Sequence, residues 1–214
     1  MRLKACKGNS CLRKFRFNFR GLAIVWPQWR LFLARTMNHV SRRTLIIAVS
    51  ATAFVSRAGA VEQGRERMAE ALIAEAVNRG RRRLAPELPP FEGDPVLDQI
   101  ARERSFDMAH GAPFDHRDEH GGYPAIEKMR ARYTRYGAMG ENIVEDFDPA
   151  GRAFDPHVFA GRAVKSWFDS DEHRENILTA AFSRAGTGVA FSRTTAYATQ
   201  VFWGPPARRG ERRS

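Results

Sequence analysis

Cysteine is scarce in this chain of 214 residues, and its two occurrences, Cys6 and Cys11, both lie close to the N-terminus. Residues 61–214 therefore contain no thiol. This absence excludes from that region a disulfide-stapled scaffold, a zinc site with cysteine ligands and a cysteine nucleophile. A fold built from these residues must be stabilised by a buried hydrophobic core, and their length suits one domain.

Acidic residues are absent from the first sixty residues, which hold 12 of the 35 lysines and arginines. The other 23 basic residues are matched by all 24 aspartates and glutamates in residues 61–214. The formal net charge of +11 is therefore a property of the N-terminal segment. The rest of the chain is not basic, and we expect no nucleic-acid partner for it.

Residues 37–60 have the layout of an export signal. Met37 is followed by the pair Arg42-Arg43, by an apolar run over 45–55 that is too short to span a bilayer, and by small residues ending at Ala60. We expect cleavage after Ala60 and export to a periplasm or to the medium, which leaves a mature chain that is not an integral membrane protein. The arginine pair also fits the twin-arginine route. The alternative is that the apolar run is a buried helix or strand.

Residues 1–36 precede this signal, whereas export signals normally begin at the N-terminus. We interpret residues 1–36 as an over-long N-terminal extension, with translation starting at Met37. The alternative is a basic membrane-facing arm, because aromatic residues such as Phe15 and Trp26 lie among lysines and arginines.

Helical periodicity and capping signals predict five helices after the export signal. Asp94-Pro95 and Asp155-Pro156 each combine an N-cap with proline at the first helical position. Arg81, Arg82 and Arg83 would follow a helix that ends near Gly80, where cations are favourable; an anion or nucleic-acid contact is the alternative. The expected helices cover residues 65–79, 95–110, 126–133, 156–167 and 171–178.

The periodicity changes near the C-terminus. Residues 186–191 and 197–203 are short runs rich in β-prone residues, and five residues separate them, so we expect a hairpin. Residues 205–214 are rich in arginine and have no apolar face, which predicts a disordered basic tail.

The pentapeptide His116-Arg117-Asp118-Glu119-His120 matches the H-x-x-E-H pattern of one group of zinc metallopeptidases. That chemistry needs both histidines on one helical face, so that their nitrogens converge on one ion and the glutamate activates a bound water. Here Pro113 precedes the motif and Gly121-Gly122 follows it, so a helix through it is not expected. A chance match in a polar loop is the favoured interpretation.

Two other segments carry candidate polar residues. Gly140-Glu141-Asn142-Ile143 places a carboxylate beside an amide in what we expect to be a glycine-containing turn. In residues 166–178, Ser170 or Asp171 can cap a helix whose first turn contains His173. Each feature alone is more typical of surface or capping residues than of a ligand site.

Taken in order, these segments resemble the CAP superfamily, also called the SCP or sperm-coating-protein-like family, in its bacterial secreted form. The resemblance covers about residues 68–203. The matching segments are Phe106-Asp107-Met108-Ala109, Phe114-Asp115-His116, Gly140-Glu141-Asn142-Ile143, Trp167 with Ser170 and 173–178, Gly186-Thr187-Gly188-Val189-Ala190, and Tyr197-Ala198-Thr199-Gln200-Val201-Phe202.

The resemblance implies an α+β domain over residues 61–204, an α-β-α sandwich with a central antiparallel sheet between helical layers. It also implies one cleft lined by a His/Glu cluster. His116 matches the family's first histidine, Glu141 its first glutamate and His173 the histidine of the bacterial Ser-x-x-His segment. Ser170 and Tyr197 stand where the eukaryotic-type branch has a second glutamate and a second histidine.

Two uses of such a cleft remain open. His116, Glu141 and His173 could hold zinc or another divalent cation and leave one coordination position free, as in a metal-dependent hydrolase of peptides or cell-wall material. The same groups could instead hydrogen-bond to one another or to a polar ligand. We favour the second interpretation, an exported module that binds a small molecule, a lipid, a peptide or a cell-envelope component.

Overall fold

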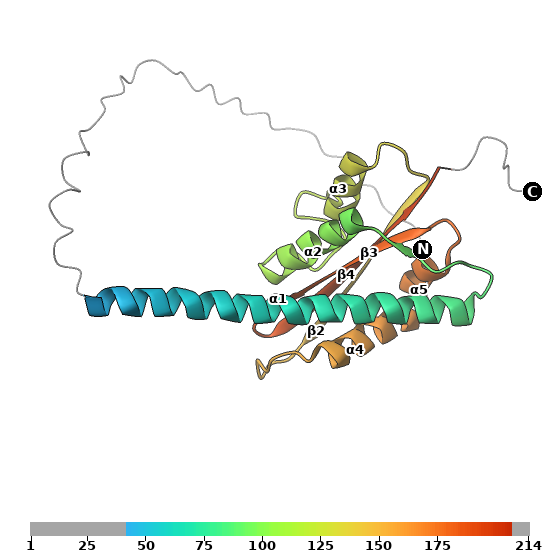
Figure 1. Ribbon diagram of the computed structural model, residues 1–214. Helices are drawn as coiled ribbons and strands as arrows, with labels where there is room; N and C mark the ends of the chain where they lie inside the picture. Colours follow the sequence, from blue (N-terminus) through green and yellow to red (C-terminus); the bar gives the residue numbers. More distant parts are fainter. Residues whose placement is uncertain (1–41, 207–214) are drawn as a thin grey trace, which may run out of the picture. The chain divides into compact units, whose positions relative to one another are not determined.

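The computed structural model describes residues 42–206, with only the helical backbone of residues 42–58. All five predicted helices and the predicted hairpin are present, and two strands were missed. The elements, labelled in Figure 1, are α1 (Arg42–Leu84), β1 (Glu92–Gly93), α2 (Pro95–Ala109), α3 (Pro124–Arg132), β2 (Ala138–Phe147), α4 (Pro156–Asp169), α5 (Asp171–Leu178), β3 (Arg184–Phe191) and β4 (Thr195–Gly204).

The two Asp-Pro signals start helices as expected. The Asp94 side chain accepts a hydrogen bond from the Val96 backbone N–H, and Asp155 accepts from the N–H groups of His157 and Val158. Ser170 serves the same purpose for α5, because its hydroxyl accepts from the His173 N–H. In each case a side-chain oxygen satisfies a backbone donor that the helix leaves unpaired.

The sheet has the strand order β1-β3-β4-β2. β2, β3 and β4 are antiparallel neighbours, but β1 pairs with β3 in parallel, so the expectation of a wholly antiparallel sheet is corrected to a mixed one. The parallel pairing is short: Glu92 lies opposite Arg184, and Gly93 lies opposite Ala185. It reflects the extended connection from α1 into α2, which adds two residues to the edge of the sheet.

Helices cover both faces of the sheet and complete the expected α-β-α sandwich (Figure 1). One core cluster joins the sheet to α1, α4 and α5 and includes Ile73, Trp167 and Phe202; the other joins it to α2 and α3 and includes Leu97 and Met129. These five side chains are completely buried. Their burial supplies the main stabilisation of a domain without disulfides.

Two glycines of β3 let α2 approach the sheet closely. A Cβ atom at Gly186 or Gly188 would overlap the backbone of α2, at Leu97 and at Arg102 respectively. Helix and strand therefore meet backbone to backbone at these two positions, which fixes where α2 lies on the sheet.

α1 is longer than predicted and does not end near Gly80. It begins at Arg42 and continues through Gly80 to Leu84. A side chain at Gly80 would overlap the Phe168 ring of α4, so this glycine permits helix packing rather than helix termination. The backbone helix also runs through the expected cleavage point after Ala60, and cleavage there stays a prediction.

Arg81 lies in the interior and not on the surface expected for the arginine triplet. Its side chain is 1% exposed, and its guanidinium donates hydrogen bonds to the backbone carbonyls of Pro89, Ile177, Thr179 and Phe182. The group ties the end of α1 to the end of α5 and to the segment leading into β3.

One smaller expectation was wrong. The Gly140–Ile143 segment is part of strand β2 and not a turn, because Gly140 packs against the Phe182 ring and the strand pairs with β4 along its length.

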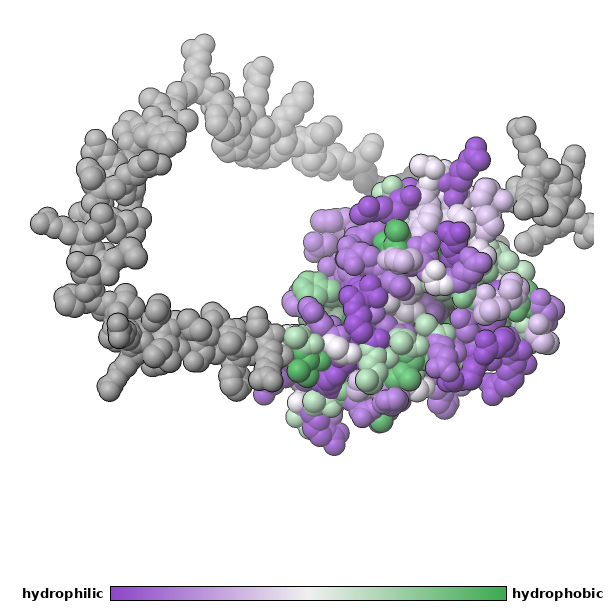
Figure 2. All heavy atoms as spheres, in the orientation of Figure 1, coloured by the Kyte–Doolittle hydropathy of each residue, from purple (hydrophilic) through white to green (hydrophobic). Residues whose placement is uncertain are grey.

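Within residues 42–206, no helix combines the length and the apolar character needed to cross a membrane. The face seen in Figure 2 is mainly hydrophilic, with small hydrophobic patches. The predicted extension 1–36 and most of the predicted tail, from residue 207 onward, lie outside the described residues.

Candidate functional site

The candidate site lies at the β2 edge of the sheet. Glu141 sits on β2 with its residue 8% exposed, and His116 comes from the loop between α2 and α3. The His116 Nδ1–H donates to Glu141 Oε2 at 2.8 Å. Residues 113–122 contain no helix or strand, as expected, so this hydrogen bond fixes the position of His116 in an irregular loop.

Arg104 of α2 completes the charge balance around Glu141. Its Nε lies 3.6 Å from Glu141 Oε1, and the two side chains are 3% and 5% exposed. The same guanidinium donates to the backbone carbonyls of Pro113 and Asp115. Arg104 therefore connects helix α2, the loop that carries His116 and the carboxylate of β2.

His173 approaches the same edge from the first turn of α5. The centroids of the His116 and His173 rings are 6.4 Å apart. The Asn142 side chain donates to the His173 carbonyl at 3.0 Å, and the Asn176 side chain donates to Asn142 Oδ1 at 2.8 Å. This amide chain holds the start of α5 against β2. We call His116, Glu141, His173 and Arg104 the His/Glu patch.

The two imidazoles of the patch have opposite pKa shifts. The hydrogen bond to Glu141 raises the pKa of His116 above its ordinary value, and burial opposes this in part. Burial lowers the pKa of His173, and the positive charge of a protonated His116 adds to the effect. As pH rises, His173 should therefore lose its proton before His116 does.

The two other candidates have different positions. Ser170 lies beside His173 as the N-cap of α5, with its hydroxyl occupied by the backbone. In the β2–β4 pairing, Tyr197 lies opposite Glu145, whereas Val201 lies opposite Glu141. Tyr197 is therefore four positions along β4 from the residue that faces Glu141. Its ring contacts Phe114, with centroids 6.3 Å apart.

Within residues 42–206, no group of three or more His, Cys, Asp or Glu side chains is placed to hold a cation. His116 directs Nδ1 at Glu141, so Nε2 is the ring nitrogen that remains for a metal or another ligand. In the H-x-x-E-H segment, the His120 and Glu119 side chains are 84% and 78% exposed. His116 and His120 therefore do not share a helical face, as that motif would require.

Two residues of the site, Arg104 and Asn176, were missed in the sequence, whereas Asn142 was named as the amide beside Glu141. Asn176 carries no signal of its own, because amides at helix positions are usually surface groups. Arg104 does carry one: it occupies a position between Ala101 and Met108 on the buried side of α2. A basic residue at an apolar position of an amphipathic helix indicates a buried charged partner.

Comparisons with known proteins agree with this architecture. The model of the cysteine-rich secretory protein family, CAP, matches residues 74–203. Protein YkwD of Bacillus subtilis strain 168 is 32% identical over 123 residues, which are 58% of this chain and 43% of YkwD. The match thus spans less than half the length of that relative.

Two solved structures are similar to this chain. An outer surface protein from Borrelia burgdorferi has the same fold and aligns with a TM-score of 0.53 and 14% identity, over 64% of this chain and 92% of that protein. An extracellular protein containing an SCP domain from Bacillus anthracis strain Ames aligns with a TM-score of 0.49 and 25% identity, over 67% of this chain and 41% of that protein.

Proposed function

Since the chain belongs to the CAP family of cysteine-rich secretory proteins, we propose that it is an exported module that binds a ligand or partner outside the cytoplasm. The His/Glu patch is the proposed binding site. The candidate ligands are a small polar molecule, a lipid, a peptide or a component of the cell envelope.

The observation that supports this proposal is the anchored but half-exposed imidazole of His116. Its side chain is 43% exposed, while the Glu141 side chain that holds it is 5% exposed. A side chain fixed by a buried partner loses little conformational freedom when it binds, which favours affinity. Because Nδ1 faces Glu141, Nε2 is the ring nitrogen left to meet a ligand.

The second histidine supports a polar ligand. His173 Nδ1 is buried and has no hydrogen-bond partner among the described residues. A buried polar atom without a partner destabilises the fold, and a ligand or an ordered water that supplies the partner removes that cost.

The export part of the proposal rests on the signal over residues 37–60 and on membership of a family described as secretory. A metal-dependent hydrolase that uses the same patch is the competing function, and the zinc titration below distinguishes the two.

The test compares His116→Ala with His120→Ala in the full chain. Each variant is mixed with fractionated small molecules, lipids, peptides and envelope material, and adducts are detected by native mass spectrometry. We expect an adduct that persists in His120→Ala and disappears in His116→Ala. An adduct that both variants retain would place the binding site elsewhere.

Calorimetric titration with zinc is the companion measurement, because it decides between the module and the hydrolase. We expect no zinc binding that depends on His116. Saturable binding that His116→Ala removes and His120→Ala retains would contradict the proposal and favour a metal centre at the patch.

A further inference from the structure

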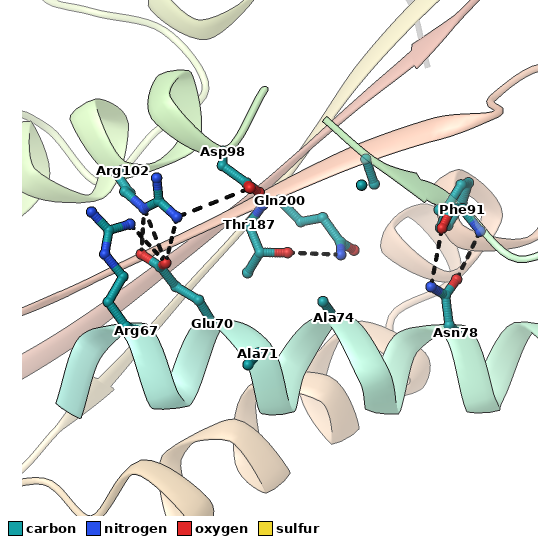
Figure 3. Close-up of a pocket in the computed structure, with 12 residues that line it drawn as sticks. Arg67, Glu70, Ala71, Ala74, Asn78, Phe91, Asp98, Arg102, Thr187 and Gln200 are labelled. Atoms are coloured by element: carbon teal, nitrogen blue, oxygen red, sulfur yellow. Dashed lines mark hydrogen bonds and ion pairs between the residues drawn. The ribbon is translucent and has the colours of Figure 1, made fainter. Parts of the chain in front are cut away.

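A cavity lies between α1, α2 and the outer edge of β3, on the side of the sheet where β1 stops (Figure 3). Its volume is about 320 Å³. β1 pairs with β3 only as far as Ala185, so no strand among the described residues continues beside Thr187. The helix beneath presents the small side chains of Ala71 and Ala74, which leave the space open (Figure 3).

The free edge of β3 beside this cavity is closed to strand addition. Asp98 Oδ1 accepts from the Thr187 N–H at 2.9 Å, and Glu70 Oε1 accepts from the Val189 N–H at 3.3 Å. Farther along, Glu66 Oε1 accepts from the Phe191 N–H at 3.0 Å. Three side chains already accept hydrogen bonds from the backbone N–H groups of this edge. An added peptide strand would therefore find no free N–H donor there. A compact molecule suits the cavity better than a strand.

Gln200 supplies a polar atom that needs a partner. The residue is 1% exposed, and its Nε2 donates to Thr187 Oγ1 at 3.2 Å. Its Oε1 has no hydrogen-bond partner among the described residues. Figure 3 shows the amide extending into the space above Ala74. A bound molecule with an N–H or O–H donor would satisfy this oxygen.

The two ends of the cavity differ in character. The Phe91 ring makes one end of the cavity apolar. The backbone of Phe91 forms two hydrogen bonds with the Asn78 side chain, which hold this residue in place. At the other end Arg67 and Arg102 both pair with Glu70 (Figure 3). With Asp98 on the same wall, two arginines meet two acidic residues there, so the formal charges of the lining balance. Burial raises the pKa of Glu70 to about 7, and the charge of Arg67 opposes this shift.

We propose that this cavity binds a small neutral amide, whose N–H donates to Gln200 Oε1 and whose short apolar group lies between Phe91 and Ala74. The guanidinium end offers donors for the carbonyl oxygen of the same amide. A neutral ligand matches the balanced charges, because an ion would leave one of them uncompensated. This site is separate from the His/Glu patch, which lies at the opposite edge of the sheet.

The test is a titration of the full ¹⁵N-labelled chain with N-acetyl-L-alanine N-methylamide, followed by NMR. We expect saturable shifts at the Gln200 side-chain amide and at the Thr187 N–H. Ala74→Leu fills the cavity with a good helix former and should abolish those shifts. Ala131→Leu, an exposed alanine on α3 outside the cavity, should retain them.

Gln200→Met removes the acceptor while keeping an unbranched side chain, and should weaken binding about tenfold. If the Gln200 amide does not respond, water satisfies the oxygen and the proposal is wrong. Equal shifts in wild type and Ala74→Leu would also overturn it, because the probe would then bind elsewhere.

Discussion

Arg104 of α2 and Glu141 of β2 face each other at 3.6 Å in the interior, and their remaining polar contacts reach outward to the loop and to His116. The half-exposed imidazole of the patch is therefore supported by a buried ion pair. Neither Arg104 Nε nor Glu141 Oε1 has a hydrogen bond among the described residues. Each of these two buried atoms is therefore stabilised by the opposite charge of the other side chain.

Removing one member of this pair should be costly. Arg104→Met leaves the Glu141 carboxylate buried without a cation and should lower the free energy of unfolding by about 3–5 kcal/mol. Urea denaturation measures the change, with Asp146→Asn as the control. Asp146 forms an exposed pair with Arg162, and its loss should cost less than about 1 kcal/mol. Equal losses in the two variants would contradict the buried pairing.

His116 should make stability depend on pH. Its folded pKa is raised, so its contribution is complete below the ordinary histidine pKa and is lost as pH rises through the folded value. Wild type should therefore lose stability relative to His116→Gln as pH rises above about 6.5, the ordinary histidine value, and on through the raised folded value. Urea unfolding at each pH measures this difference.

His173 acts in the opposite direction, because its lowered pKa gives a contribution that is present above the ordinary value and lost as pH falls. Because the charge of His116 contributes to this shift, the comparison of His116 with His116→Gln is made in a His173→Gln background, which removes the effect. NMR titration checks the order directly: the His116 imidazole should titrate above His173. The reverse order would rule out the hydrogen bond to Glu141 as the dominant influence.

Arg81 should matter far more than its neighbour Arg82. Arg81→Met leaves four carbonyl groups, in two buried and two partly buried hydrogen bonds, without their donor, which should lower the free energy of unfolding by at least about 3 kcal/mol. Arg82 is exposed in the same turn, and Arg82→Met should change it by less than about 0.5 kcal/mol. Thermal and urea unfolding of both variants check the contrast, and similar midpoints would argue against the buried position.

The close contact of α2 with β3 gives another matched pair of variants. Gly188→Ala puts a methyl group into the α2 backbone near Arg102 and should destabilise the domain by at least about 1–3 kcal/mol. Gly161→Ala in α4 meets nothing within 4 Å and should stabilise it by about 0.5–1 kcal/mol through helix propensity. Opposite signs in urea denaturation are the expected result; a neutral Gly188→Ala would mean that helix and strand are not in backbone contact.

The sequence was sufficient for the elements whose signals are local. Asp94-Pro95 and Asp155-Pro156 predicted helix starts, and the β-prone runs predicted the β3–β4 hairpin. β2 was missed because glycine, glutamate and asparagine are poor strand formers, and the segment forms a strand only by pairing with β4. Long-range contacts also decide the length of α1, where Gly80 is kept helical by packing against Phe168.

The candidate site also combines residues that the sequence indicated with residues whose roles depend on long-range contacts. The family resemblance pointed to His116, Glu141 and His173, and the structure brings these three together at one sheet edge. The buried roles of Arg104 and Arg81 were not predicted, because each depends on carbonyls or a carboxylate contributed by distant segments. A charge pattern along one helix does not reveal such partners.

Export should remove the N-terminal segment without loss of the core. The α1 side chains in the main cluster, Ala69, Ile73 and Val77, all follow Ala60, so a chain that begins at Val61 keeps them. Intact-mass spectrometry of the exported product should give an N-terminus at Val61. Replacing both Arg42 and Arg43 by lysine should reduce export strongly if the twin-arginine route is used, since that pathway reads the arginine pair. A product that retains residues 1–36 would contradict the signal, and unchanged export of the lysine variant would favour the general secretory route.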